Sequence, residues 1–137
     1  MLKEASISEL RSKDIPKDHR VLVNRGRGND ELAPSDALYK DFNTNKARLE
    51  RELGKGSAEA HNKAYLECDY ERRFREKVTQ NHEALTKLKE IAGRSEQDDV
   101  YLVCYEGPGK ACHRRILLRM AEESFGARVV VDGVEPT

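Results

Sequence analysis

The sequence predicts an α/β fold in which helices pack on a small, mainly parallel sheet of about four strands. Short apolar runs alternate along the chain with longer segments of helical periodicity, which is typical of strands joined by crossover helices. The chain has 137 residues, a length that fits one domain and can bury a core without metal or disulfide staples. We therefore expect a single domain over residues 1–137, with its core in about 20–132.

The first half of the chain predicts two strands and one long helix. Residues 2–7 are a candidate strand, and the apolar run at 20–24 is a second strand that ends in the turn RGRGND. Ser35 is a good N-cap, because its hydroxyl can accept from the free backbone N–H groups of the first turn. The helix that it caps should run to Gly54, which is a typical C-terminal stop.

The second half predicts three helices and two strands. Ser57 can cap a helix that continues to a break near 79–81, and apolar residues at helical spacing favour another helix that ends at Gly93. The continuous apolar run DVYLVC is typical of a strand buried on both faces. These observations predict helices from 58 to about 78, at 82–93 and at 111–124, and strands at 99–104 and 128–132.

Composition narrows the function classes. The 25 basic and 25 acidic residues cancel, so a globally basic nucleic-acid binder is not indicated. No stretch approaches the roughly 20 apolar residues of a membrane span, and the first residues lack the apolar core of a signal peptide. We therefore expect a cytoplasmic protein that does not enter membranes, in which Cys68, Cys104 and Cys112 are free thiols.

Cationic residues follow two of the predicted strands. In open α/β sheets, ligands bind beyond the carboxyl ends of the strands, near helix N-termini. If the turns after 24 and after 104 face one crevice, they should attract an anion, such as a phosphate-bearing small molecule, a nucleotide or a nucleic-acid backbone. We expect Arg114 and Arg115 to reach outward to its rim. The candidate ligand-binding residues are Arg25, Arg27, Lys110, His113, Arg114 and Arg115.

Three segments resemble a known family. LVCYEGPGKACHRRILLRMA is similar to the Cys-His-Arg signature of the domain of unknown function 488 family, which also follows an apolar strand. RVLVNRGRG with LAPS resembles the family's early pattern, and AYLECDYERRFREKV resembles its middle helix. The resemblance covers about residues 20–125, although the Trp-Pro of many members is missing. It implies a small intracellular α/β domain and nominates Cys104, Cys112, His113 and Arg114 without naming a reaction.

The sequence leaves three functions open: an anion-binding module, a cysteine-dependent enzyme and a protein-interaction module. CYEGPGK has the layout of cysteine phosphatases, but Lys110 replaces the forked arginine and Pro108 removes a backbone N–H. A phosphatase- or sulfurtransferase-like enzyme would use Cys104 or Cys112, with His113 as a further catalytic candidate. Helical spacing equally favours Cys112 and His113 as core residues. We assign no metal and no cofactor, because zinc sites usually have two close ligand pairs.

Overall fold

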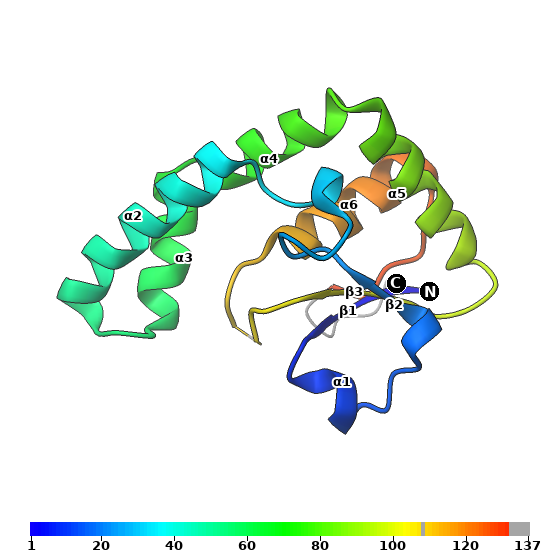
Figure 1. Cartoon of the computed structure of the whole chain (residues 1–137), viewed down its shortest axis with the longest axis horizontal. Coiled ribbons are helices and arrows are strands. Elements are labelled where there is room, and N and C mark those ends of the chain that lie inside the picture. The colour runs from blue at the N-terminus through cyan, green and yellow to red at the C-terminus, as the bar shows by residue number, and fades with distance from the viewer. Residues whose placement is uncertain (108, 132–137) are drawn as a thin grey trace.

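A three-stranded parallel sheet and six α-helices make up the described part of this computed structural model, residues 1–107 and 109–131 (Figure 1). The fold is therefore α/β, as predicted, with three strands in place of about four. In chain order the elements are β1 (Leu2–Ser6), α1 (Glu9–Ser12), the 3₁₀ turn η1 (Lys17–His19), β2 (Arg20–Leu22), the 3₁₀ turn η2 (Asp30–Leu32), α2 (Asp36–Leu53), α3 (Ala58–Glu67), α4 (Tyr70–Thr79), α5 (His82–Arg94), β3 (Val100–Cys104) and α6 (His113–Phe125).

The sheet has the order β1–β3–β2, so β3 is its central strand. β1 pairs with β3 in parallel from Leu2 opposite Val100 to Ser6 opposite Cys104, and β2 pairs with the other edge of β3. A central strand with both edges paired and both faces covered must be apolar throughout, which is why VYLVC carries no polar alternation. The three strands confirm the predictions at 2–7, 20–24 and 99–104.

Of the predicted fourth strand at 128–132, the described residues 128–131 form isolated bridges in place of a strand, and one of these bridges pairs Leu2 with Val129. Leu2 donates its N–H to the Arg128 carbonyl at 2.8 Å and accepts from the Val130 N–H at 2.9 Å. Residue 132 lies outside the described residues. The prediction of a fourth strand was wrong, since the described sheet has three strands. A run of valines supplies strand propensity, whereas a strand also needs continuous pairing along a partner edge.

The two faces of the sheet bury different clusters. Val100, Leu102 and Cys104 face the large core beneath α4, α5 and α6, whereas Val103 faces a small cluster with Ala5 beside α1. This alternation follows from the two-residue period of a strand. Figure 1 shows α4, α5 and α6 on one side of the sheet and α1 on the other.

Side-chain caps set where three of the helices begin. Ser35 accepts from the Leu38 N–H, Ser57 from the Ala60 N–H and Asn81 from the Ala84 N–H, each at 3.2 Å. Each cap satisfies one of the backbone donors that a first turn leaves unpaired. The predicted starts after Ser35 and Ser57 are therefore confirmed.

The single helix predicted from 58 to about 78 is in fact two. α3 ends at Glu67, and Asp69 adopts a left-handed conformation (φ 55°) before α4 begins at Tyr70. Helical periodicity continues across this junction in the sequence, so the pattern did not reveal the break. The turn redirects the chain, so that α2 and α3 extend as a hairpin away from the sheet while α4 runs back over it (Figure 1).

Among the described residues, no helix combines the length and the apolar character needed to cross a bilayer.

Candidate functional site

Two cysteines and a histidine meet where β3 ends and α6 begins. Cys104 is the last residue of β3, and Cys112 is the N-cap of α6 with extended backbone (φ −150°, ψ 148°). His113 Nδ1 lies 3.7 Å from the Cys112 sulfur and 4.0 Å from the Cys104 sulfur. All three side chains are buried, and their potential ligand atoms lie within 4.8 Å of one another. We call these three residues the Cys-His cluster.

The fold fixes the orientation of the His113 ring. Its Nε2–H donates to the Val23 carbonyl at 2.7 Å, just beyond β2, and the Phe74 ring packs edge-on at 5.3 Å between centroids. Because Nε2 is held by a carbonyl acceptor, Nδ1 is the ring atom that faces the two sulfurs. A histidine oriented by a second group in this way is the arrangement that activates cysteine nucleophiles.

Electrostatic interactions give the two thiols different pKa values. Burial alone would raise the pKa of Cys112, but a hydrogen bond from Cys104 and the charges of His113 and Arg114 outweigh burial and hold that pKa well below its usual value. Burial likewise opposes the charged form of His113, yet the Cys112 thiolate beside it raises the histidine pKa above its ordinary value. The positive end of α6 also favours a thiolate at its N-cap.

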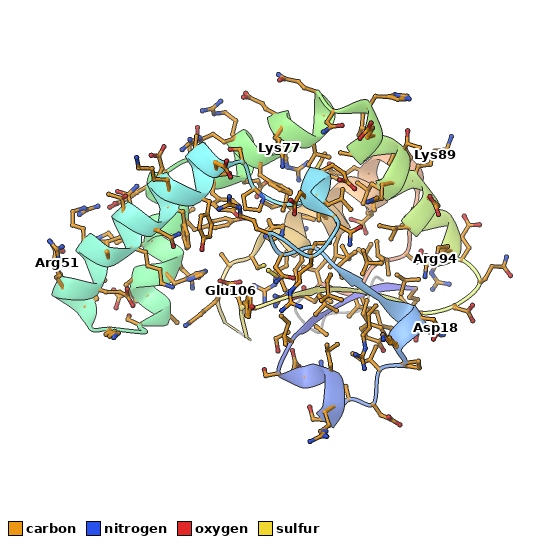
Figure 2. The ribbon with its side chains drawn as sticks, viewed as in Figure 1. Asp18, Arg51, Lys77, Lys89, Arg94 and Glu106 are labelled. Carbon is orange, nitrogen blue, oxygen red and sulfur yellow. The ribbon has the colours of Figure 1, made fainter. Side chains whose placement is uncertain are left out.

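Cys104 remains a thiol. Hydrogen bonding to Cys112, burial and the nearby Glu106 carboxylate all raise its pKa. The Cys104 sulfur lies 3.6 Å from Glu106 Oε2, which can accept a hydrogen bond from the thiol. Figure 2 shows Glu106 just beyond the end of β3, on the side where α2 and α3 lie. Of the two cysteines, Cys112 is therefore the one with the character of a nucleophile.

A pocket of about 310 Å³ opens beside the cluster. Both predicted turns contribute to its lining, with Asn24 and Arg25 from the first and residues 104–106 and 111–113 from the second. The remaining wall comes from α2, α3, α4 and Pro34, and it is rich in aromatic rings. We call this the Cys112 pocket. Its volume lies at the lower end of the range for small-molecule sites.

Two buried polar side chains that line the pocket have unpartnered atoms. Among the described residues, neither amide atom of Asn24 has a hydrogen-bond partner, and His61 Nδ1 has none either. Asn24 was not among the predicted site residues, although its position directly after a strand was a signal, because ligands bind beyond the ends of strands. Nothing in the sequence distinguished His61 from a core histidine on an apolar helix face.

The loop that joins β3 to α6 is tied to α3. Asn62 donates to the Gly109 carbonyl and accepts from the Ala111 N–H, each at 2.8 Å, and the Lys110 N–H points to the Gly107 carbonyl at 3.4 Å. In a phosphatase-like cradle, the backbone N–H groups of Lys110 and Ala111 would point at a phosphate. Here both already point at acceptors within the protein. Pro108, which entered that comparison, lies outside the described residues.

Arg114 does not reach outward as expected. It is 1% exposed, and its Nε lies 3.0 Å from Glu4 Oε1 on β1, with Arg115 Nε 2.9 Å from the same oxygen. The outward expectation was wrong because Glu4, 110 positions earlier in the chain, brings a carboxylate to this helix turn. Neither arginine lines the Cys112 pocket.

The other predicted cations are dispersed. Arg25 lines the pocket, with its guanidinium carbon 4.2 Å from the centre of the Tyr39 ring and with an ion pair to the exposed Asp36. Arg27 is exposed, and neither Arg27 nor Lys110 belongs to the described lining. Lys46 on α2 does belong to it, although no feature of the sequence singled out one lysine of this charged helix.

The Cys-His cluster offers three of the four ligands of a tetrahedral zinc site. Zinc would need both thiols deprotonated. A tetrahedral site also needs a fourth ligand, and among the described residues no further Cys, His, Asp or Glu groups with these three. The arrangement therefore fits a thiolate–histidine pair better than a metal centre.

Comparison with known proteins gives one match. A family model described as the active DUF488-N3 subclade, DUF488-N3a, matches residues 7–124, which is most of the chain. No curated protein and no solved structure matches the chain. Since the match runs from the end of β1 through the Cys-His cluster to the end of α6, the chain belongs to the DUF488 family.

Proposed function

We propose that this protein is a cysteine-dependent enzyme in which the Cys112 thiolate attacks a small anionic substrate held in the Cys112 pocket. One observation carries the proposal: the Cys112 sulfur is at the N-cap of α6, 3.7 Å from a histidine nitrogen, and both residues line the pocket. A nucleophile, an oriented base and a space for substrate are the minimum set for covalent catalysis. The description of the matching subclade as active is consistent with this function.

The chemistry is a two-step group transfer to water. The Cys112 sulfur forms a bond to an electrophilic centre of the substrate, and the bond to the leaving group breaks as His113 Nδ1 gives the leaving group its proton. Water then attacks the thioester-like or thiophosphate-like intermediate and passes a proton to Nδ1. The product departs, and the thiolate and the protonated histidine are restored.

Arg25 and Lys46 are the cations proposed to select an anion such as a phosphate-bearing small molecule. Both side chains line the pocket, and no ion pair holds Lys46 among the residues the structure describes. Arg114 and Arg115 are engaged with Glu4, so they are not expected to bind the substrate directly. Glu106 lies on the Cys104 side, where its charge disfavours an anion. The anion should therefore lie toward Arg25 and Lys46.

Alkylation of the thiols with iodoacetamide at graded pH tests the nucleophile. Peptide mass spectrometry would follow Cys112 and, as an internal control, the buried Cys68 of the α3–α4 junction, whose pKa burial raises. Cys112 should react well below the ordinary thiol pKa of about 8.5. His113→Asn should move its reaction toward that pH, whereas Cys104→Ser should leave the histidine-dependent reaction in place.

Inorganic phosphate tests the anion. Phosphate should slow the alkylation of Cys112 in the wild type, and this protection should weaken in Lys46→Gln. Lys63→Gln, on α3 and outside the pocket lining, is the matched control. If Cys112 reacts only in parallel with Cys68 at every pH, the thiolate–histidine proposal is wrong. If phosphate protects equally in both lysine variants, the anion does not bind where proposed.

A further inference from the structure

Asn24 and His61 line the Cys112 pocket, and both amide atoms of Asn24 and Nδ1 of His61 are buried without a hydrogen-bond partner among the described residues. Asn24 is 5% exposed and His61 is 1% exposed, so water reaches neither side chain freely. An unpartnered buried polar group costs stability, and its persistence at a pocket wall points to a partner supplied by a ligand.

The chemistry of the two side chains defines that partner. The Asn24 amide offers one acceptor and two donor hydrogens side by side. His61 Nε2–H donates to the Ala111 carbonyl at 2.7 Å, and burial lowers the pKa of the ring, so Nδ1 is a neutral acceptor. A ligand that satisfies both must carry an adjacent donor and acceptor along one edge, together with a second donor.

The pocket walls favour a flat ligand. Tyr39, Phe42, Tyr65 and Tyr70 line it, and they interlock: the Phe42 ring meets the His61 ring edge-on at 5.0 Å, and Tyr65 stacks on Tyr70 at 4.4 Å. Aromatic faces bind planar rings by stacking without regard to their substituents. Arg25 and Lys46 add positive charge at the same pocket.

We propose that the Cys112 pocket binds a nucleotide, with its base edge hydrogen-bonded to Asn24 and His61, its ring face against the tyrosines, and its phosphate at Arg25 and Lys46. Nucleobases carry donors and acceptors side by side on a planar ring, and an asparagine amide pairs with such an edge in a bidentate manner. The inference deepens the proposed function, since it names the substrate class of the same pocket.

A free nucleotide fits better than a nucleic-acid strand. Polymer binding draws most of its affinity from many phosphate contacts and the counterions that they release. The chain has 25 basic and 25 acidic residues, and two of its cations line the pocket beside the aromatic wall. One phosphate group matches this number of charges.

Titration calorimetry tests the inference with the four ribonucleoside monophosphates, their nucleosides, inorganic phosphate and a single-stranded oligonucleotide. At least one monophosphate should bind more than tenfold tighter than phosphate. Asn24→Leu should lower that affinity at least tenfold while the affinity for phosphate stays unchanged. Asn45→Leu, on α2 outside the pocket lining, is the matched control.

A second measurement separates ligand recognition from a structural role. Because the buried Asn24 amide has no partner among the residues that the structure describes, Asn24→Leu should raise the urea midpoint while it lowers nucleotide affinity, whereas a structural asparagine would lower the midpoint. His61→Gln provides an independent variant: it should also weaken the monophosphate and spare phosphate.

The outcomes distinguish this inference from the proposed function. Binding of phosphate with no gain from any base, or of the oligonucleotide alone with a steep loss at high salt, would overturn nucleotide recognition and leave the Cys112 chemistry standing. Tight nucleotide binding that depends on Asn24, together with an ordinary Cys112 thiol, would support nucleotide recognition and overturn the nucleophile.

Discussion

Removing the Glu4 carboxylate should strongly destabilise the protein. The Glu4 side chain is 9% exposed and the Arg114 side chain 2% exposed, so Glu4→Ala leaves the Arg114 guanidinium buried and without the carboxylate that its Nε contacts at 3.0 Å. One guanidinium nitrogen of Arg114 already has no partner among the described residues.

The size of the loss follows from the geometry. With charges about 4 Å apart and an effective dielectric constant of about 20, the attraction is about 4 kcal/mol, and breaking a buried pair on one side typically costs about 3–5 kcal/mol. Urea unfolding, monitored by circular dichroism, would measure this loss of unfolding free energy. Small proteins lose about 1–3 kcal/mol of unfolding free energy per molar of urea, so the urea midpoint should fall by at least about 1 M.

Two further variants make the test selective. Glu76→Ala breaks the exposed Arg72–Glu76 pair on α4, and it should cost less than about 1 kcal/mol because solvent screens that pair. Glu4→Leu combined with Arg114→Met should recover most of the loss, since an apolar pair of similar volume often replaces a buried ion pair without cost. A Glu4→Ala loss no larger than that of Glu76→Ala would refute the reasoning.

Three further predictions concern the core, a helix cap and pH. Leu102→Ala, in the middle of β3, should cost about 2–5 kcal/mol of unfolding free energy by urea titration, and a loss below 1 kcal/mol would show that the site collapses around the cavity. Ser57→Ala should cost about 1 kcal/mol in the same assay, and Ser57→Thr, which keeps the hydroxyl, should cost less. The lowered pKa of Cys112 adds stability that is lost as pH falls through its folded pKa, and the raised pKa of His113 adds stability that is lost as pH rises through its folded pKa. The difference in unfolding free energy between wild type and Cys112→Ser should therefore be largest between about pH 6.5 and 8.5 and should decrease at lower and at higher pH. A difference that does not change with pH would contradict the ion pair between the Cys112 thiolate and the protonated His113.

Local signals predicted much of the fold. The apolar run before Cys104 predicted a central strand because a strand buried on both faces admits no polar alternation. Ser35 and Ser57 predicted the starts of α2 and α3 because the cap is a contact within one turn. The partners in interactions of this kind lie within a few residues of one another in the sequence, so the interactions can be predicted from the sequence alone.

Contacts between distant segments were not predictable in the same way. Asp69 breaks a continuous helical pattern by its backbone conformation alone, and the described residues 128–131 form isolated bridges but no strand despite their valines. Arg114 was expected at the rim because its acid, Glu4, is 110 residues away. The sequence therefore predicted cations beside a strand end but not which of them are neutralised.

The same division applies to the candidate site. By itself, the sequence determined that Cys104 ends a buried strand and that Cys112 and His113 lie at the start of the next helix, because strand and helix propensities are local. Only the tertiary structure decided that Cys112 and not Cys104 is the nucleophile candidate, and that Asn24 and His61 face the same pocket. Those properties depend on the Val23 carbonyl, on Glu106 and on burial, and they exist only once segments far apart in the chain have packed together.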